Sequence, residues 1–230
     1  MNNLILSSTT FGVVISFLGF MIGMALKKRF KIAIFNPLLI AILLVIAVLK
    51  LFRIDYSSYN ASAKYLSYLL TPATVCLAIP LYTQLEKLRQ NLLAILCALA
   101  VGVLTSLVSV LALSALFRLS HQEYVTLLPK SVTSAIGMGV SEELGGYSSI
   151  TVAVIILSGN FGIVSGVLVC RLFRITEPIA KGLGMGVASH AIGTARAMEW
   201  GELEGAMSSL AIVVSGLLTV VGASVFSNFL

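Results

Sequence analysis

Two polar stretches of this apolar chain carry the residues that could bind an anion. In the first stretch, Pro129 is followed by Lys130, Ser131, Val132 and Thr133. A helix that begins here presents free backbone N–H groups and the positive end of its dipole beside the lysine and the hydroxyls. Lys130, Ser131 and Thr133 are therefore predicted to form a compact anion site. The alternative is that Lys130 extends to the membrane interface while the hydroxyls cap the helix.

The second stretch contains Ser189, His190, Thr194 and Arg196. In a helix, residues 189 and 196 share one face, and His190 lies beside Thr194 at i, i+4 spacing. A histidine and an arginine inside a membrane segment are costly, so a role in a ligand site is the first interpretation. His190 titrates near neutrality in its ordinary state, which makes it the predicted proton handler. The alternative pairs Arg196 with Glu199 at the surface and His190 with a neighbouring carbonyl.

The elements that must position these residues are membrane helices. The chain has 230 residues, of which 58% are hydrophobic and 10% charged, and its mean hydropathy is +1.04. Soluble domains have about 25% charged residues. At about 20 to 25 residues for each crossing and its loop, the length allows roughly eight membrane segments and leaves no room for a soluble domain. We expect an all-α, polytopic, transporter-like protein that forms a single membrane domain over residues 1–230.

Six apolar runs are long enough, or nearly so, to cross a bilayer; they cover residues 4–26, 32–51, 65–82, 92–117, 150–172 and 205–229. Two further segments, residues 127–146 and 182–201, carry glycine, hydroxyl groups and charge, so neither can face lipid. We expect scaffold-like helices in residues 4–51 and a core in residues 65–229 that contains both polar segments. Prolines at positions 72 and 80 indicate a kinked or interrupted helix in the third run.

The distribution of Lys and Arg predicts the path of residues 127–146. A basic cluster at residues 27–31 follows the first apolar run, which places that end in the cytoplasm and the N-terminus outside. If every segment crosses once, six basic residues lie in inside loops and seven in outside loops. If residues 127–146 instead return to the side from which they entered, the counts become nine inside and four outside. We therefore expect a re-entrant hairpin here and a second one, from the cytoplasm, at residues 182–201, as in secondary transporters.

The sequence contains no motif of a known catalytic or metal site. Neither GxSxG nor GxxxxGK[ST] occurs, and the two histidines, His121 and His190, are far apart. Cys76, Cys97 and Cys170 lie singly in apolar runs and are interpreted as packing residues. We expect no enzymatic activity, no cofactor and no metal.

The polar stretches resemble those of the LrgB-type membrane proteins, which include CidB and are described as antiholin-like. The resemblance rests on LPKSVT at residues 128–133, the glycine pair at residues 145–146, ASHAIGTAR at residues 188–196 and NPLL at residues 36–39. It spans nearly the whole chain, and ASHAIGTAR is its most specific string. The resemblance implies a multi-pass protein of the bacterial inner membrane.

The resemblance implies two accounts of function. In one, family members work with a small LrgA- or CidA-type holin-like membrane partner to control murein hydrolase activity and cell lysis. In the other, relatives carry small carboxylates such as pyruvate, or glycolate and glycerate in plastids. A regulatory scaffold would not need costly cations inside the membrane, so the residues favour the carrier account. The non-transporting regulator is the alternative.

The sequence thus predicts a carrier or facilitator of small monocarboxylates. We expect Lys130 and Arg196 to supply the positive field for one anion, the four hydroxyls of the two stretches to supply hydrogen bonds, and His190 to handle a coupled proton. We also expect a homodimer or a complex with the small partner. The substrate, the coupling ion, the direction of flux, the partner's stoichiometry and the directness of any lysis control stay open.

Overall fold

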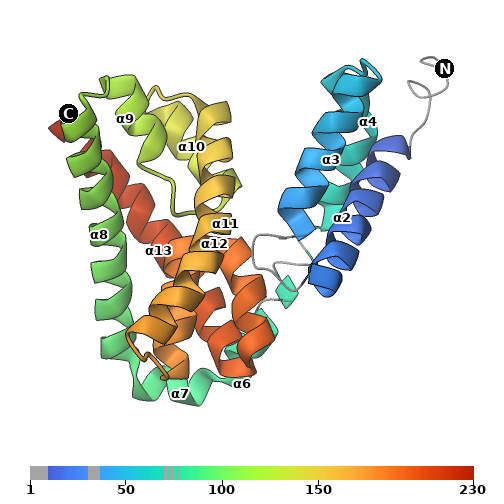
Figure 1. Cartoon of the computed structure of the whole chain (residues 1–230). Coiled ribbons are helices and arrows are strands. Elements are labelled where there is room, and N and C mark those ends of the chain that lie inside the picture. Colours follow the sequence, from blue (N-terminus) through green and yellow to red (C-terminus); the bar gives the residue numbers. More distant parts are fainter. Residues whose placement is uncertain (1–9, 31–36, 70–71, 73–74, 77) are drawn as a thin grey trace. The chain divides into compact units, whose positions relative to one another are not determined.

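The computed structural model describes residues 10–30, 37–69, 72, 75–76 and 78–230 (Figure 1). These residues form helices and turns, with no strand among them. Four of the described helices are long and apolar enough to cross a membrane, namely Phe11–Phe30, Leu92–Phe117, Ser148–Leu172 and Glu202–Phe229. The predicted all-α, polytopic membrane fold is confirmed. The chain divides into two compact units, Met1–Cys76 and Leu77–Leu230.

The first unit is a small helical assembly held together by glycines. It contains α2 (Phe11–Phe30), α3 (Pro37–Leu51), α4 (Tyr56–Ala63) and the 3-10 helix η1 (Lys64–Leu69). A Cβ on Gly19 would lie 3.2 Å from Cα of Ala41, and a Cβ on Gly23 would lie 2.7 Å from Cα of Pro37. Such close approach is typical of membrane helix pairs, whose association depends on packing between small residues.

The apolar run at residues 65–82 is described only in part, because residues 70–71, 73–74 and 77 lie outside the described residues. Residues 65–69 belong to η1 in the first unit and residues 78–82 to α6 (Ala78–Thr83) in the second, and the described residues 72, 75 and 76 between them are helical. Pro80 lies within α6, and the kink or interruption expected from the two prolines stays a prediction. The NPLL string at residues 36–39 lies partly outside the described residues, as do the start of the first apolar run and the end of the basic cluster.

The second unit is built around α8 (Leu92–Phe117), which follows α7 (Leu85–Gln90). One face of α8 is buried at a spacing of three or four residues, by Ile95, Leu99, Val103, Leu107 and Val110. This face packs against α12 and α13. A neighbouring stripe of α8 carries small and hydroxyl residues and forms one wall of a cleft described below.

Between α8 and α11 the chain enters the unit and turns back. It forms α9 (His121–Leu127), a non-helical turn and α10 (Ser134–Glu143). The backbone N–H of Tyr147 donates to Oγ1 of Thr126 at 2.8 Å, and Oγ1 of Thr151 donates to the Thr126 carbonyl at 2.9 Å. The entry and the exit of this first hairpin therefore lie side by side.

Neither arm of the first hairpin can cross a membrane. At 1.5 Å per residue α9 and α10 are about 10 and 15 Å long, against a hydrocarbon core of about 30 Å. A capping box starts α9, in which the Ser120 N–H donates to the Glu123 carboxylate at 2.8 Å. This bond, with a second one from the Ser120 hydroxyl, lowers the pKa of Glu123. The chain leaves the unit at the end where it entered, as expected of a re-entrant segment (Figure 1).

The second polar segment is also a hairpin. It forms α12 (Pro178–Trp200), which breaks at His190, where φ is 42° and ψ is −132°. A Cβ on Gly193 would lie 2.4 Å from the carbonyl oxygen of Met185. In a straight helix these two residues would be about 12 Å apart. The chain therefore folds back on itself at His190.

Both arms of this second hairpin pack on α13 (Glu202–Phe226). A Cβ on Gly186 of the first arm would lie 2.6 Å from the carbonyl oxygen of Ser208. From the second arm, Oγ1 of Thr194 shares a 2.8 Å hydrogen bond with Oγ of the same Ser208. Small residues permit this close contact between the helices.

The two hairpins enter from opposite ends of the unit, and their turns meet at the middle of α11 (Ser148–Leu172). The Ser158 hydroxyl donates to the Lys130 carbonyl at 3.0 Å. Nε2 of His190 shares a 3.3 Å hydrogen bond with the carbonyl of Ile155. Ser158 lies about 15 Å along the helix from Ser148, which is half the thickness of a hydrocarbon core.

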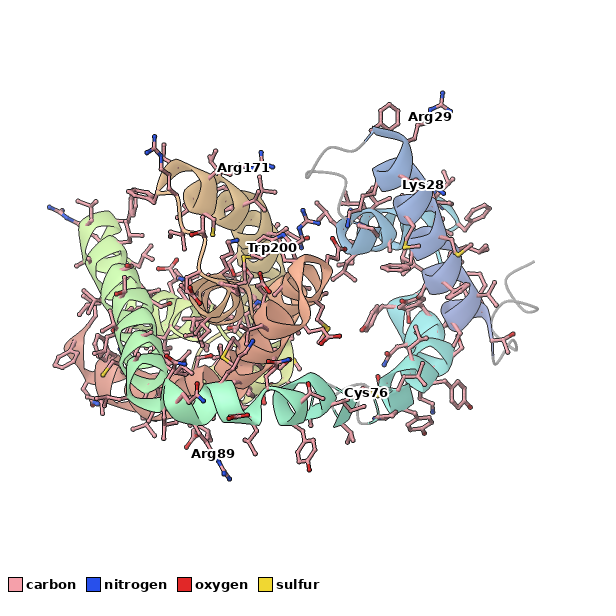
Figure 2. The ribbon with its side chains drawn as sticks, turned by 90° about the horizontal axis from the view of Figure 1, so that it is seen from below. Lys28, Arg29, Cys76, Arg89, Arg171 and Trp200 are labelled. Atoms are coloured by element: carbon pink, nitrogen blue, oxygen red, sulfur yellow. The ribbon has the colours of Figure 1, made fainter. Side chains whose placement is uncertain are left out.

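Basic residues gather at one end of the second unit. Lys87, Arg89, Arg171, Arg174 and Lys181 lie where α8 begins, α11 ends and α12 begins. Arg89 and Arg171 point outward there (Figure 2). Arg118 follows α8 at the opposite end. Under the positive-inside rule, the end with five basic residues is the one expected in the cytoplasm.

This arrangement makes a topological prediction. Single cysteines at the exposed positions Gln122 and Ser149, before and after the first hairpin, should both react with an impermeant maleimide added to intact cells. A cysteine at the exposed Glu177, at the opposite end, should react only after the cells are opened. The background must lack the three native cysteines, of which two are exposed. Labelling at Gln122 without labelling at Ser149 would show that the segment crosses the membrane.

Candidate functional site

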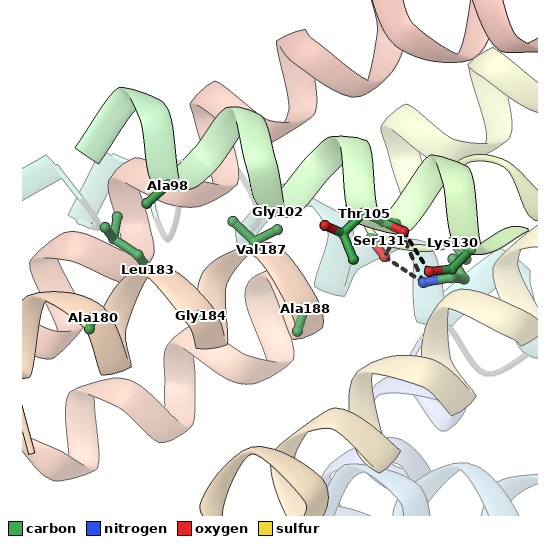
Figure 3. Close-up of a pocket in the computed structure, with 12 residues that line it drawn as sticks. Ala98, Gly102, Thr105, Lys130, Ser131, Ala180, Leu183, Gly184, Val187 and Ala188 are labelled. Atoms are coloured by element: carbon green, nitrogen blue, oxygen red, sulfur yellow. Dashed lines mark hydrogen bonds between the residues drawn. The ribbon is translucent and has the colours of Figure 1, made fainter. Parts of the chain in front are cut away.

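A cleft of about 520 Å³ lies between α8 and the first arm of α12, beside the turn of the first hairpin (Figure 3). Its polar lining comprises Thr105, Ser106, Ser109, Lys130 and Ser131. Its apolar lining includes Ala98, Gly102, Leu183, Gly184, Val187 and Ala188. The three walls thus come from segments that are far apart in the sequence.

Lys130 is the cation of this cleft. Its ammonium donates to Oγ of Ser106 at 3.1 Å and to Oγ of Ser131 at 3.0 Å, and these two hydroxyls are 2.9 Å apart. An ammonium has three N–H donors. The two hydroxyls therefore leave one donor for a ligand, and the cluster offers hydroxyl donors beside it.

No negative charge in the described part of the chain lies within ion-pair distance of Lys130. The residue is partly buried, and its neighbour Ser131 is buried. Ser106 lies about 16 Å along α8 from Phe117. The ammonium bonded to it is therefore within about one helical turn of the middle of a 30 Å hydrocarbon core. A cation at this depth with only neutral partners makes this cleft a candidate anion site, because an anion would form a charge-assisted hydrogen bond with it.

Of the three predicted residues in the first stretch, the structure brings two to the cleft. Lys130 and Ser131 lie in the non-helical turn, whereas Thr133 is the N-cap of α10 and makes no side-chain capping bond. Thr133 does not line the cleft. The third member of the cluster is the hydroxyl of Ser106. This residue lies on α8 and was not among the predicted site residues.

His190, Ser189 and Thr194 form the buried turn of the second hairpin and lie outside the lining of the cleft. A Cβ on Gly159 of α11 would lie 3.0 Å from the His190 ring. Thr194 donates to the His190 carbonyl at 2.9 Å. The Ser189 hydroxyl is fully buried and has no hydrogen-bond partner among the described residues. His190 thus makes the bond to a neighbouring carbonyl that the alternative named, and its role with a proton stays a prediction.

Arg196 is separated from Lys130. It forms an ion pair with Glu199, three residues along the same arm, and its guanidinium carbon lies 5.9 Å from the centre of the Trp200 ring. Its side chain is 32% exposed, and it does not line the cleft. The expected convergence of the two cations is therefore not the arrangement in this structure. Pairing with Glu199 is the alternative that the sequence also allowed.

The cleft residues that the sequence analysis missed are the hydroxyls of α8. Thr105 and Ser109 donate to the carbonyls four residues before them, at 2.7 and 2.5 Å, as in many membrane helices. Ser106 instead reaches Lys130 and Ser131. Three hydroxyls within five residues of a largely apolar run were a visible signal. Only packing shows that one of the three faces a charge.

A smaller cavity of about 260 Å³ lies on the other side of the first arm of α12, toward α11. Ala180, Gly184 and Ala188 line both cavities. These residues follow one another at i, i+4 spacing and form a shared wall of small residues. No cluster of three or more His, Cys, Asp or Glu side chains that could hold a metal occurs in the described part of the chain.

Comparisons with known proteins agree over nearly the whole chain. A family model described as the LrgB-like family matches residues 16–229. Proteins named antiholin-like protein LrgB from Bacillus mycoides (strain KBAB4), Bacillus cereus (strain B4264) and Bacillus anthracis (strain CDC 684 / NRRL 3495) are 38% identical over 221 residues, which cover 96% of this chain and 96% of each relative. No solved structure matches the chain.

Proposed function

The chain belongs to the LrgB-like family, and we propose that it acts as a membrane carrier or facilitator of small monocarboxylates of the pyruvate and glycolate class. The observation that carries this proposal is the ammonium of Lys130, which is held at mid-membrane depth by two hydroxyls and no carboxylate of the described chain. A cation at the centre of a membrane helix is disfavoured by ~2.5 to 3.5 kcal/mol on insertion scales. A bound carboxylate compensates this cost.

The two hairpins support transport rather than a static scaffold. Their turns come from opposite ends of the unit and meet on α11, through Ser158 for the first and Ile155 for the second. Broken helices that meet near the midplane form the substrate sites of many secondary transporters. We further propose that the end bearing α7 faces the cytoplasm, that the N-terminus lies outside, and that His190 handles the coupled proton.

The alternative function is that of a non-transporting antiholin-like regulator in the bacterial inner membrane. The observation that favours it is the name of the relatives, antiholin-like protein LrgB. In this account a small LrgA- or CidA-type membrane partner would be required, and an effect on murein hydrolase activity and lysis would follow from that complex. A homodimer is compatible with either account.

Uptake by purified protein in liposomes decides between the two functions. We expect saturable uptake of labelled pyruvate, faster when a pH gradient is imposed, and no such uptake in protein-free liposomes. Pyruvate should also raise the thermal unfolding temperature of the protein, because a ligand that binds only the folded state stabilises it. Absence of both uptake and stabilisation by pyruvate or glycolate would favour the regulator.

A further inference from the structure

The cleft beside Lys130 is polar at one end and apolar at the other. Figure 3 shows Lys130, Ser131 and Thr105 together at one end, and Leu183, Ala98 and Ala180 at the other. Ser106 and Ser109 belong to the polar group, so every hydroxyl and the only charge of the lining lie on one side. The remaining lining consists of glycine, alanine, leucine and valine.

The cleft is larger than a two- or three-carbon acid requires. Its volume of about 520 Å³ falls in the range of about 300 to 1,000 Å³ that holds drug-sized ligands. Along α8 the distance from Ser106 to Ala98 is about 12 Å. A carboxylate bound to Lys130 would therefore leave a stretch of several carbon atoms unfilled along the apolar walls.

Gly184 leaves space at the apolar end, whereas Gly102 permits close approach of α8 and α12. Gly184 belongs to the wall formed by α12, and a Cβ built on it would meet no atom within 4 Å. On the facing wall, a Cβ on Gly102 would lie 3.0 Å from Cγ1 of Val187. The glycine at position 184 is therefore not required by close helix packing, unlike Gly182 and Gly186 of the same arm, whose Cβ atoms would meet α13 at 2.5 and 2.6 Å.

We propose that the cleft binds monocarboxylates that carry an apolar chain or ring of several carbons, with the carboxylate at Lys130 and the apolar part along Gly102, Gly184 and Ala98. This inference rests on the proposed carrier function and extends its substrate class from two- and three-carbon acids to longer monocarboxylates. A single charge is required because the apolar end offers no partner for a second carboxylate, and an unpaired buried charge is strongly disfavoured. An apolar tail is favoured because it removes both its own surface and that of the cleft from water.

The test is a binding series on the purified full chain in lipid nanodiscs. The ligands are acetate, butyrate and hexanoate, with hexanol and the dicarboxylate adipate as comparisons, and the measured quantity is the dissociation constant from thermal stabilisation. Each methylene that becomes buried should tighten binding about threefold to fourfold. Hexanoate should therefore bind far more tightly than acetate. Hexanol should bind weakly because it has no carboxylate, and adipate should bind weakly because its second carboxylate would lie at the apolar end.

Two variants separate the cleft from partition into lipid. Gly184→Leu fills the apolar end of the cleft. The factor by which hexanoate binds more tightly than acetate should therefore be far smaller than in the parent. Gly139→Leu is the matched control, because Gly139 also has no atom within 4 Å of its added Cβ, is also helical and does not line the cleft. In Gly139→Leu, the ratio of the acetate to the hexanoate dissociation constant should equal that of the parent. Ala98→Leu, on the opposite wall, repeats the test if Gly184→Leu does not fold.

The outcomes distinguish this inference from the function on which it rests. A ratio that falls in Gly184→Leu and not in Gly139→Leu supports the apolar-tail substrate. Binding of acetate and pyruvate without any gain along the series overturns the inference and leaves the carrier function intact. A gain that persists in Gly184→Leu and Ala98→Leu also overturns it, since the tail then lies elsewhere. If no carboxylate of any length binds, the carrier function itself fails and the inference fails with it.

Discussion

Replacing Lys130 by methionine should raise the pyruvate concentration for half-maximal uptake by about ten- to hundredfold. The substitution removes a charge-assisted hydrogen bond worth ~1.5 to 3 kcal/mol and keeps an unbranched side chain. The protein should still fold, because Ser106 and Ser131 are 2.9 Å apart and can bond to each other, and because no carboxylate of the described chain loses a partner. The measurements are uptake in liposomes and pyruvate-dependent thermal stabilisation.

Arg196→Met is the control for Lys130→Met. Both residues are cations of the hairpins, but Arg196 is paired with Glu199 and does not line the cleft. Its replacement should leave the half-maximal pyruvate concentration within about twofold of the parent, in line with the small contribution of exposed ion pairs. An equal loss in both variants would mean that the two cations converge on one anion in a state other than this structure.

Gly186→Ala should destabilise the protein strongly, whereas Gly184→Ala, two residues away, should not. A Cβ at position 186 would lie 2.6 Å from both the Ser208 carbonyl oxygen and the Ala211 Cβ, so α12 and α13 would have to separate. Overpacking of this kind costs ~1 to 3 kcal/mol, and sometimes more. At position 184 the added methyl meets no atom within 4 Å, and alanine is better than glycine in a helix by ~0.5 to 1 kcal/mol.

The difference between these two alanine variants is measured as the free energy of unfolding in a denaturant titration of the reconstituted protein. Both changes add the same methyl group to the same arm of α12. Helix propensity therefore cancels in the comparison, and the contact of position 186 with α13 accounts for the expected loss of stability. Equal stability of the two variants would show that the first arm does not pack on α13 as described.

The long helices could be predicted from sequence because the bilayer imposes their length. The runs at residues 92–117, 150–172 and 205–229 agree closely with α8, α11 and α13. A lipid-facing helix must satisfy its backbone hydrogen bonds internally and be apolar over ~20 residues, so composition alone identifies it. The run at residues 65–82 also met the composition criterion, but it is described only in part, with η1 at one end and α6 at the other.

The first hairpin was predictable from the distribution of Lys and Arg, because a single crossing by residues 127–146 would place more basic residues outside than inside. The turns themselves were less so. Residues 128–133 are non-helical and α10 begins only at Ser134, so the lysine lies in the turn and not in the first turn of a helix. In α12 the break falls on His190, a residue with a φ of 42°. A histidine at this position does not predict a positive φ, because that backbone region favours glycine.

The sequence by itself determined the membrane class, the long spanning helices, the family and the presence of two polar segments with a costly lysine, histidine and arginine. Only the tertiary structure decided which of these residues share a site. Helical spacing gives the relative directions of side chains along a continuous helix, and this information is lost where the chain reverses, as it does at His190. One partner of Lys130 is Ser106, 24 residues away on α8. A contact between separate helices depends on how the helices pack, and periodicity within one helix does not predict that packing.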